Sequence, residues 1–353
     1  MRLAKLRKKV DSIDSRIVDL LAKRADVTKG IGGLKAKDSS SVYAPDREKY
    51  IYERILKLNK GEIPDDAMKA IYREIMSASL ALERSLNIAY LGPELTFTHL
   101  AALKKFGSSL GYTGCNTIGD VFAEVEHSRS DYGVVPIENS IEGAVNHTLD
   151  MFVDSDLKIC SEVYMEISHN LLSKVRNTSK IKKIYSNPQV FGQCRIWLES
   201  EAPHAELLEV SSTAKAARIV SESASSACIA SLKAGEKYNL NVLARGIEDF
   251  SHNTTRFLVI GKRDANPTTG DKTSIMASIK DKVGALHDML VPFKRHRINL
   301  TKIESRPSKI RPWEYYFFID LEGHHSDKRV GRALADLKRE AAYLKILGSY
   351  PKA

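Results

Sequence analysis

The chain of 353 residues is 43% hydrophobic and 28% charged, with a formal net charge of +10 at pH 7. This is the composition of a folded globular protein, which excludes a disordered or fibrous chain. The longest apolar runs are too short to cross a bilayer, and the charged N-terminus lacks the apolar stretch of a secretory signal. We therefore expect a cytoplasmic protein with no membrane partner and, at this length, two or three domains.

Charge and cysteine content narrow the partners further. Lys and Arg exceed Asp and Glu at both ends of the chain, but no basic run is interleaved with aromatic residues as in nucleic-acid-binding segments. Small anionic ligands account for the basic ends equally well, and a solvated basic surface is a third interpretation. The four cysteines are widely spaced, and no glycine-rich nucleotide loop or zinc spacing occurs. We expect no disulfide, metal, cofactor or nucleic-acid partner.

The first expected element is a long helix over residues 3–34. Apolar residues recur there at alternating spacings of three and four, which is the pattern of a helix with a coiled-coil-like seam. Arg24 interrupts this seam, and a guanidinium in an apolar seam is costly unless an anion meets it. Gly30, Gly32 and Gly33 weaken the helix near its end, which indicates a close backbone approach there.

Two shorter helices are expected after a serine-rich loop at 38–41. One starts after Pro45 and ends at Gly61, and the next opens at Pro64 with its apolar residues on one face. Three helices of unequal length cannot bury the long seam of the first. We therefore expect an all-α three-helix domain over residues 1–85 that forms an intertwined dimer.

Polar residues of these helices form the first candidate site. Arg24 and Lys35 are eleven residues apart, about three helical turns, so both face the same way. Arg7 lies seventeen residues before Arg24, roughly 25 Å along the axis, so only the Arg7 of a partner chain could meet the same small molecule. The remaining candidates begin the second helix or lie one turn apart on the third: Arg47, Glu48, Ser79 and Glu83.

In the stretches LRKKVDSID, LLAKR, GGLKAK, PDRE and SASLALE, residues 1–84 resemble the all-helical chorismate mutases. The resemblance implies that Arg7 of the partner chain, Arg24 and Arg47 hold the two carboxylates of chorismate. The rearrangement to prephenate is pericyclic and needs no nucleophile. Catalysis then depends on holding the compact conformer and on stabilising charge at the breaking C–O bond.

The resemblance also implies that Lys35 donates to the ether oxygen, that Glu48 accepts from the ring hydroxyl, and that Ser79 and Glu83 complete the pocket. Two positions depart from the family pattern. Ala44 stands where a polar residue is common, and Glu83 stands where some relatives have Gln. A Glu donates to the ether oxygen only when protonated, so these positions favour the alternative of a helical domain that only dimerises. Surface salt bridges are a further alternative for Lys35 or Ser79 alone.

From about residue 86 the pattern changes to strands alternating with helices. Segments such as LNIAYLGP, YGVVP, KKIYS and LLEVS read as strands followed by helices, which predicts a mostly parallel α/β sheet. Such sheets bind ligands at the carboxyl ends of strands, beside helix N-termini. The polar loop residues that we expect to converge there are Glu138, Asn139, Ser140, Gln193, Thr255 and Arg256.

Through the motifs GPELTFTH, PIENS and N-x-T-R-F, residues 86–264 resemble prephenate dehydratase. The resemblance implies an α/β domain of two lobes, like the periplasmic ligand-binding proteins, with the active site in the cleft. It places the catalytic threonine at Thr255. It also implies other polar groups of the site, catalytic or substrate-binding: Glu138, Asn139, Gln193, Thr96, Ser140 and Arg256.

Prephenate must lose its ring hydroxyl and a carboxylate together, and the departing hydroxyl needs a proton donor. Thr255 is expected to fill this role, with Glu138 as the alternative, while Arg256 and helix N-termini bind carboxylate. Leu95 replaces the glycine of G-P-x-G-T-F, which puts a tight backbone approach near Thr96 in doubt. Asn187 replaces a histidine of S-H-P-Q. For single polar residues of the set, helix capping is the alternative.

After a linker at 264–271, residues 272–353 read strand, helix, strand, strand, helix, strand, the α+β ferredoxin-like order. The segments VGALHDML and IESRPSKIRPWEYYFF resemble the ACT domain attached to these dehydratases. Two motifs would line an L-phenylalanine site between two chains: Gly284, Ala285 and Leu286, and Glu304, Ser305, Arg306 and Pro307. Glycine at 284 lets a ligand approach the backbone. A purely structural dimerisation domain is the alternative, and Val283 replaces the usual proline.

Together these resemblances predict a multidomain homo-oligomer, a dimer or tetramer, of the bifunctional chorismate mutase–prephenate dehydratase family. Its ligands would be chorismate and prephenate, and L-phenylalanine would inhibit it. One alternative is a monofunctional dehydratase whose helical domain only dimerises. Another is a non-enzymatic two-lobed regulator that binds an amino acid, against which PIENS and Thr255–Arg256 argue, because simple binding needs no such cluster.

Overall fold

A computed structural model describes the chain over residues 2–37, 42–178, 181–223, 225–279, 282–308 and 314–353. The serine-rich loop expected at 38–41 lies outside this part of the chain. The chain divides into two compact units. The first comprises Met1–Asn87 with Phe106–Gly111, and the second comprises Ile88–Lys105 with Tyr112–Ala353.

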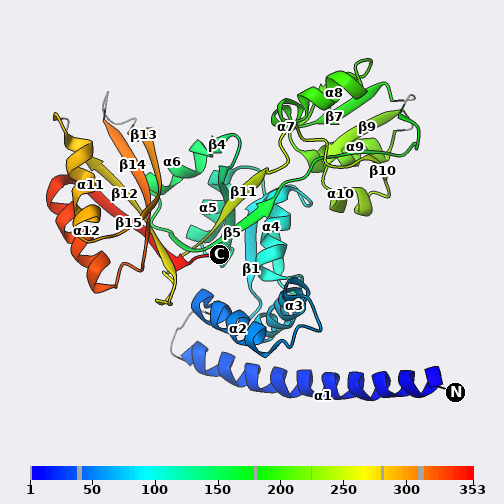
Figure 1. Cartoon of the computed structure of the whole chain (residues 1–353), viewed down its shortest axis with the longest axis horizontal. Coiled ribbons are helices and arrows are strands. Elements are labelled where there is room, and N and C mark those ends of the chain that lie inside the picture. Colours follow the sequence, from blue (N-terminus) through cyan, green and yellow to red (C-terminus); the bar gives the residue numbers. More distant parts are fainter. Residues whose placement is uncertain (1, 38–41, 179–180, 224, 280–281, 309–313) are drawn as a thin grey trace. The chain divides into compact units, whose positions relative to one another are not determined.

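The first unit contains the three expected helices, α1 (Arg2–Lys37), α2 (Pro45–Leu58) and α3 (Asp65–Glu83). Proline stands at the first position of α2, where its fixed φ and missing N–H are tolerated. α1 packs on α3 and runs well beyond it (Figure 1). In α1, every described side chain up to residue 23 is exposed. The apolar seam is therefore not buried within one chain.

Of the three glycines that weaken the end of α1, Gly32 stands where the helix packs closely against another element. A Cβ at this position would lie 3.0 Å from the Cα of Glu83, so α1 and α3 approach at backbone distance there. Gly30 and Gly33 face open space among the described residues. The expected close approach therefore holds at Gly32 and not at the other two.

The second unit begins with a mixed sheet, here called the first sheet. Its strands in spatial order are β2 (Gly111–Cys115), β1 (Asn87–Leu91), β3 (Tyr132–Asn139), β11 (Thr254–Gly261) and β5 (Lys158–Glu166), with β4 (Gly143–Ala144) paired to β3. Its helices are α4 (Phe97–Phe106), α5 (Ile118–Glu126) and α6 (Asn146–Asp154). A core that includes Phe122 and Phe152, in edge contact at 5.1 Å, lies between the sheet and the helices α5 and α6.

A second sheet has the order β10 (Asn241–Ala244), β6 (Asn170–Ser173), β9 (Ser226–Ala230), β7 (Lys183–Ser186) and β8 (Glu206–Glu209). Its helices are α7 (Pro188–Gln193), α8 (Arg195–Glu201), α9 (Thr213–Ser221) and α10 (Leu232–Lys237). Ser212 and Ser231 accept backbone N–H groups at the starts of α9 and α10, so Ser212 is a helix cap.

The expectation of a mostly parallel sheet was wrong. β1 pairs parallel to β3, and β7 pairs parallel to β8 and β9, but β11 runs antiparallel to both β3 and β5. The reason is the chain path. The chain leaves the first sheet after β5, builds the second sheet and returns as β11, so the returning strand opposes its neighbours.

The expected ferredoxin-like order of the last segment is confirmed. The C-terminal sheet has the order β13 (Leu300–Pro307), β14 (Tyr315–Glu322), β12 (Asp271–Ile279) and β15 (Ala341–Pro351). α11 (Ala285–Arg295) and α12 (Lys328–Glu340) cover one face of it (Figure 1). Its other face, through Met276, Phe318 and Leu347, joins the apolar core of the first sheet.

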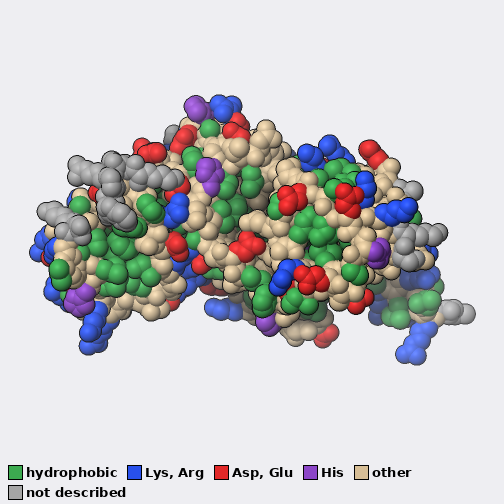
Figure 2. Space-filling model, turned by 90° about the horizontal axis from the view of Figure 1, so that it is seen from above, with side chains coloured by type: hydrophobic (Ala, Val, Ile, Leu, Met, Phe, Trp, Pro, Cys, Tyr) green, Lys and Arg blue, Asp and Glu red, His purple; other side chains and the backbone are tan. Residues whose placement is uncertain are grey.

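The surface carries charges of both signs. On the face drawn in Figure 2, Lys and Arg side chains are interspersed with Asp and Glu and do not gather into one basic stripe. Such mixing gives little electrostatic attraction for a polyanion on this face. None of the described helices is both long and apolar enough to cross a membrane.

We predict that Gly32→Ala destabilises the protein by about 1–3 kcal/mol, because the new methyl group overpacks the α1–α3 contact. Gly33→Ala is the matched control. Its Cβ enters open space, so helix propensity should stabilise it by about 0.5–1 kcal/mol. Denaturant unfolding followed by far-ultraviolet circular dichroism measures both. Equal effects of the two substitutions would contradict the close approach at Gly32.

Candidate functional site

The second unit places Thr255 beside Asn139. β11 starts at Thr254 and lies antiparallel to the end of β3, in the register that pairs Thr255 with Asn139 and Arg256 with Glu138. Successive side chains of a strand point to opposite faces. Thr255 and Asn139 therefore share one face of the sheet, and Arg256 and Glu138 share the other.

Asn139 is held by four hydrogen bonds. Its Nδ2 donates to Thr255 Oγ1 at 2.9 Å and to Asn253 Oδ1 at 2.6 Å. Its Oδ1 accepts the backbone N–H groups of Ile141 at 2.9 Å and Glu142 at 3.0 Å. Backbone amides only donate, so they determine which end of the Asn139 amide is oxygen. The amide must then donate to the threonine.

Gln193, at the end of α7, continues this chain of polar contacts. Its Oε1 accepts from Asn253 Nδ2 at 3.2 Å and contacts His169 Nε2 at 2.7 Å. Its Nε2 donates to Glu142 Oε1 at 2.7 Å. The Glu142 carboxylate also accepts from Gln189 at 2.9 Å. A continuous hydrogen-bonded path therefore connects helix α7 of the second sheet to Thr255 of the first.

This path determines what the Thr255 hydroxyl can do. The side chain is only 9% exposed, and its oxygen accepts from Asn139. A donor on a hydroxyl oxygen makes the remaining O–H more acidic, and linked hydrogen bonds polarise one another in a low dielectric. With its oxygen occupied by the Asn139 amide, the Thr255 hydroxyl can act chemically as a proton donor.

His169 anchors the far end of the path in its neutral form. The ring is 1% exposed, lies edge-on to Phe97 at 5.6 Å, and has a buried Nδ1 without a hydrogen-bond partner among the described residues. Since Gln193 Oε1 only accepts, the Nε2 must carry the proton. Burial lowers the pKa of His169, and Gln193 and Glu248 oppose this shift only in part.

Arg256 requires a correction. We expected it to bind a substrate carboxylate, but its guanidinium points away from Thr255 and is 5% exposed. It donates to Glu162 at 2.8 Å, to Asp320 at 2.5 Å and to Tyr350 at 2.8 Å. The alternation of side chains along β11 is the reason, because adjacent residues cannot both face the cleft.

Glu138 lies on the same far face. Its carboxylate is 2.9 Å from Lys302 Nζ and 3.8 Å from Arg256 Nη1. The role of Glu138 as the alternative proton source stays a prediction, for a carboxyl group that these two cations hold on the face opposite Thr255.

Two further expected substrate ligands have roles within the protein. Ser140 donates to the carbonyl of His252 at 3.0 Å and accepts the N–H of Thr254 at 2.9 Å, which holds the start of β11. Thr96 donates to the carbonyl of Leu91 at 2.9 Å and accepts the N–H of His99 at 3.4 Å, which caps α4. Leu95, which replaces the family glycine, has a φ of 71°, so the backbone adopts the left-handed conformation that favours glycine although a side chain is present.

Three residues of the polar path were missed by sequence reasoning. Asn253 is fully buried and is the first residue of the N-x-T-R-F motif, and Glu142 lies two residues after PIENS. The motifs themselves were therefore the available signal for both residues. His169 stands in the segment ISHN between two strands. A lone His there gives no periodic or spacing signal, so only the tertiary contact with Gln193 identifies it.

In the first unit, α1 and α3 bring four of the expected residues into two pairs. Arg24 Nη1 donates to Ser79 Oγ. Lys35 Nζ is 2.9 Å from Glu83 Oε2, with the two side chains 26% and 8% exposed, and also donates to the carbonyl of Val42 at 2.8 Å. Both pairs place a cation of the long helix against the same partner helix.

The remaining residues of the first candidate set lie elsewhere in this unit. The guanidinium of Arg47 lies 4.7 Å above the ring of Tyr50, and Glu48 accepts from Tyr43 Oη at 2.8 Å. Arg7 lies on the exposed part of α1, far along the helix from Arg24. One chain alone does not bring Arg7 to the other candidates, as its distance along the helix requires.

The two motifs expected to bind phenylalanine begin α11 and form β13. Gly284 precedes α11 with φ of 78°, Ala285 is buried, and Leu286 is 45% exposed. On β13 the exposed and half-buried residues alternate through Glu304, Ser305, Arg306 and Pro307. Arg306 makes a two-oxygen ion pair with Asp150 of α6 at 3.1 Å.

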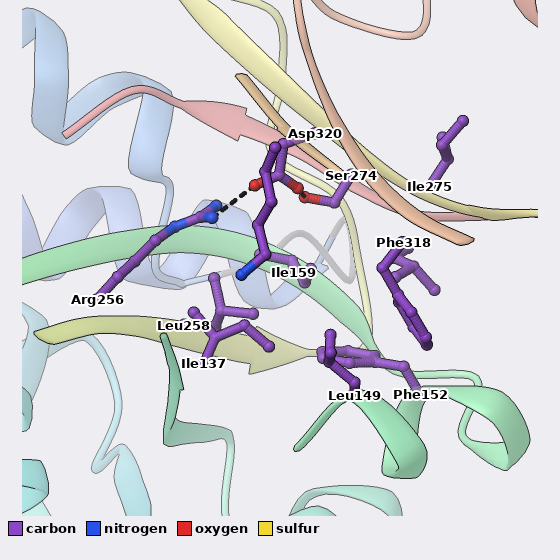
Figure 3. A pocket seen from close by; sticks show the side chains of 12 residues that line it. Ile137, Leu149, Phe152, Ile159, Arg256, Leu258, Ser274, Ile275, Phe318 and Asp320 are labelled. Carbon is purple, nitrogen blue, oxygen red and sulfur yellow. Dashed lines mark hydrogen bonds and ion pairs between the residues drawn. The ribbon is translucent and has the colours of Figure 1, made fainter. Parts of the chain in front are cut away.

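A small cavity lies between the first sheet and the C-terminal sheet (Figure 3). Apolar side chains such as Leu149, Phe152 and Phe318 line most of it, with Arg256 and Asp320 at one side (Figure 3). Its volume of about 20 Å³ is enough for one water molecule. It therefore cannot hold prephenate or an amino acid.

Thiol and metal chemistry have little support among the described residues. All four cysteines are buried and unpaired, and burial raises the pKa of the Cys160 thiol to about 12. A buried thiol in its neutral form is a poor nucleophile. No group of three or more His, Cys, Asp and Glu side chains in the described part of the chain could hold a metal ion.

We predict that His169 makes the protein less stable in acid. Its pKa is lowered in the folded state, so below about pH 6.5 the unfolded chain binds a proton that the folded chain does not. Stability therefore falls as the pH drops from about 6.5 toward the folded-state pKa. The melting temperature of His169→Gln should fall less between pH 7.5 and 5.5 than that of the wild type. The exposed control His204→Gln should match the wild type, and a His169→Gln that also does so would refute the assignment.

The family models and the similar known proteins all indicate the same family. Residues 88–265 match the family model of prephenate dehydratase, residues 6–84 that of chorismate mutase type II, and residues 273–339 that of the ACT domain. The bifunctional chorismate mutase/prephenate dehydratase of Aquifex aeolicus is 52% identical over 99% of this chain and 98% of its own length.

Among solved structures, a prephenate dehydratase from Arthrobacter aurescens in complex with L-Phe aligns with a TM-score of 0.70 at 33% identity, covering 75% of this chain and 90% of that one. A protein described as a quorum quenching acylase, GqqA, aligns at 0.68 and 26%, covering 76% and 98%. The relatives that match over the whole length and the three family models together show that the chain belongs to the bifunctional chorismate mutase/prephenate dehydratase family with a C-terminal ACT domain.

Proposed function

We propose that the chain rearranges chorismate to prephenate in its helical unit and converts prephenate to phenylpyruvate beside Thr255, under feedback inhibition by L-phenylalanine. The observation that carries the dehydratase assignment is the hydrogen-bonded path that ends on Thr255 Oγ1. A protein that only bound a ligand would not need a buried hydroxyl whose oxygen is occupied and whose proton is free to be donated.

In the dehydratase step, Thr255 donates its proton to the ring hydroxyl as the C–O bond breaks and water leaves. The bond to the ring carboxylate breaks at the same time, and its electron pair completes the aromatic ring as CO₂ departs. Thr255 then regains a proton from solvent. Asn139 holds the threonine oxygen during this transfer, and general acid catalysis of this kind contributes about 10²–10⁴-fold. With Arg256 turned away, helix N-termini remain the candidates for binding the carboxylates.

In the mutase step, the protein binds and orients without nucleophilic chemistry. Arg24 and Arg47 would bind carboxylates, and Glu48 would accept from the ring hydroxyl. The ion pair of Lys35 with Glu83 supports Lys35 as the donor to the ether oxygen, since Glu83 holds the ammonium group in place. Fixed positive charge at the breaking C–O bond lowers the barrier because it need not reorganise.

We further propose that two copies of α1 pair to complete this site, with Arg7 supplied by the partner chain. The apolar residues exposed along α1 of one chain are Leu3, Leu6, Val10, Ile13, Ile17, Val18, Leu20, Leu21, Val27, Ile31 and Leu34. A stripe of this length exposed to water is typical of an interface and not of a monomer surface. Pairing would bury the stripe and bring a partner arginine to a site that Arg7 of the same chain does not reach.

The C-terminal domain is proposed to bind L-phenylalanine at Gly284–Leu286 and Glu304–Pro307. The matching motifs and the L-Phe complex of the Arthrobacter aurescens relative support this assignment. Binding would alter the dehydratase only if it favours one state of the enzyme over another. The contacts between the C-terminal sheet and strands β3 and β11 would then transmit this preference to the dehydratase site.

Arg24→Ala should lower chorismate mutase activity by about 10²–10³, the usual effect of removing one key donor. Dehydratase activity on added prephenate should survive, because Arg24 and Thr255 belong to different units. Lys29→Ala, an exposed cation on the same helix, is the matched control and should retain both activities. Mutase activity is measured as the loss of chorismate, and dehydratase activity as the formation of phenylpyruvate from added prephenate. Both are followed by ultraviolet absorbance. If both activities fall together, Arg24 has a structural role.

Thr255→Val should lower turnover of prephenate by about 10² or more, because it keeps the shape and removes the proton donor. Thr255→Ser keeps the hydroxyl and should retain substantial activity. Mutase activity should be unchanged in both variants, and a thermal melt checks folding. A folded valine variant that turns over at the wild-type rate would remove Thr255 from the mechanism.

A further inference from the structure

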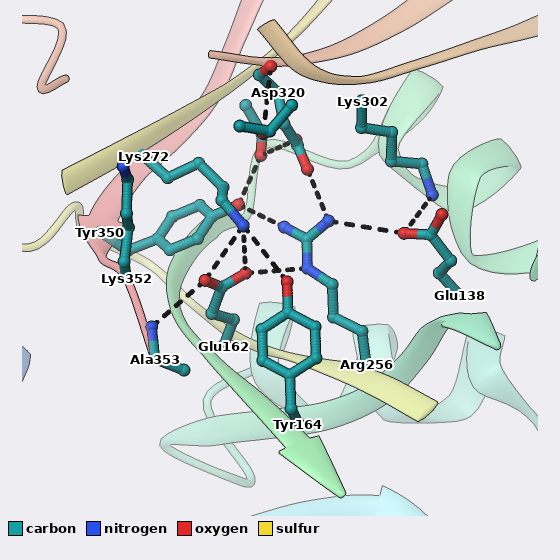
Figure 4. Close-up of polar contacts among 12 residues, drawn as sticks. Glu138, Glu162, Tyr164, Arg256, Lys272, Lys302, Asp320, Tyr350, Lys352 and Ala353 are labelled. Carbon is teal, nitrogen blue, oxygen red and sulfur yellow. Dashed lines mark hydrogen bonds and ion pairs between the residues drawn. The ribbon is translucent and has the colours of Figure 1, made fainter. Parts of the chain in front are cut away.

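Four charged side chains lie directly behind the catalytic pair, on the far face of the first sheet. Glu138 and Arg256 are cross-strand partners on β3 and β11, and Lys302 and Asp320 are cross-strand partners on β13 and β14. Lys302 Nζ is 2.9 Å from Glu138, Arg256 Nη1 is 2.5 Å from Asp320, and Arg256 Nη1 is 3.8 Å from Glu138 (Figure 4). These four residues are called here the charge quartet.

The quartet is part of a buried polar junction. The side chains of Arg256, Asp320 and Lys302 are 5%, 9% and 10% exposed. Glu162 accepts from Arg256 and, at 2.9 Å, from Lys272, while Tyr350 accepts from Arg256 (Figure 4). Removing one partner of a buried ion pair is strongly unfavourable. The quartet therefore resists any sliding of the C-terminal sheet over β3 and β11.

Each residue of the catalytic pair adjoins one member of the quartet. Asn139 follows Glu138, and Thr255 precedes Arg256, so a displacement of either charged residue moves the neighbouring backbone. The 2.9 Å hydrogen bond between Asn139 and Thr255 depends on both backbones. Misplacement of reacting groups by about 1 Å is enough to cost about 10²-fold in rate.

The opposite side of the quartet leads to the proposed phenylalanine site. Lys302 lies two residues before Glu304 on β13, so the two side chains are on the same face of the strand. This face is turned toward the first sheet, where Lys302 meets Glu138. Gly348 of β15 leaves no room for a Cβ against the carbonyl of Ile159 on β5. The C-terminal sheet therefore meets the first sheet at backbone distance at β15, while the ion pair of Lys302 with Glu138 joins the two sheets at β13.

We propose that the charge quartet positions the Asn139–Thr255 pair and couples it to the C-terminal sheet, so that a displacement of β13 changes dehydratase turnover. The coupling part of this inference rests on the proposed binding of phenylalanine at β13, whereas the positioning part does not. Lys302 and Arg256 act here as positioning residues, because neither touches the reacting atoms.

A second tether between the same two sheets provides a matched control. Lys345 of β15 donates to the carbonyls of Phe152, Val153 and Ser155 at the end of α6, at 2.8–3.2 Å. It joins the C-terminal sheet to the same dehydratase domain as Lys302 does, but these three hydrogen bonds go to α6 and its C-cap and not to β3 or β11. The substitution Lys→Met at the two positions removes the same charge and keeps similar bulk.

The test compares Lys302→Met with Lys345→Met in the full-length protein. Glu138 is 38% exposed, so Lys302→Met leaves it in contact with solvent and the variant should fold, as a thermal melt would verify. We expect Lys302→Met to lower kcat for prephenate by about 3–10-fold with KM within about 2-fold. Its phenylalanine inhibition constant should rise by about 10-fold, within the usual range of allosteric coupling, while calorimetry shows unchanged phenylalanine binding. Lys302→Arg, which keeps the charge, should restore both.

The outcomes separate the two proposals. Lys345→Met should leave kcat and inhibition at wild-type values. If Lys302→Met also does so, or if Lys302→Arg fails to restore what Lys302→Met loses, the quartet has no positioning role and the inference is overturned. If the wild type neither binds phenylalanine nor is inhibited by it, the sensor proposal fails, and the kcat comparison alone then decides whether the quartet positions Thr255.

Discussion

The pairing of β3 with β11 is the constraint on which the second unit depends. One register places Thr255 opposite Asn139 and Arg256 opposite Glu138. The two faces of the paired strands β3 and β11 therefore make different contacts. One face carries the Thr255 hydroxyl held by Asn139, and the other carries buried ion pairs to the C-terminal sheet. A shift of one residue in this register would exchange the faces and lose both sets of contacts at once.

The face that carries Thr255 depends on a path of neutral amides more than on charge. Asn139 donates both to Thr255 and to Asn253, Asn253 donates to Gln193, and Gln193 donates to Glu142, so donation runs outward from Asn139 to both ends of the path. The path also joins α7 of the second sheet to Thr255 of the first sheet, so residues of both sheets contribute to the surroundings of the hydroxyl.

Neighbouring residues in a motif need not share a role. Thr255 and Arg256 stand together in N-x-T-R-F, and a reading along the chain assigns both to the substrate. The strand geometry separates them, because a side-chain period of two sends each to a different face. The same holds for Asn139 and Glu138 in PIENS. In both motifs, the charged residue pairs with the C-terminal sheet and the neutral residue belongs to the hydrogen-bonded path of amides.

Local patterns in the sequence predicted most helices and strands of this protein. The three helices of the first unit and the βαββαβ order of the last segment follow from periodicity and end signals, which act over a few residues. The mixed direction of the sheets, the neutral His169 and the charge quartet depend on contacts between segments far apart in the chain. Such contacts are decided by packing in three dimensions, which no periodicity along the chain records. The sequence by itself therefore determined which polar residues are available, and the tertiary structure decided which of them meet.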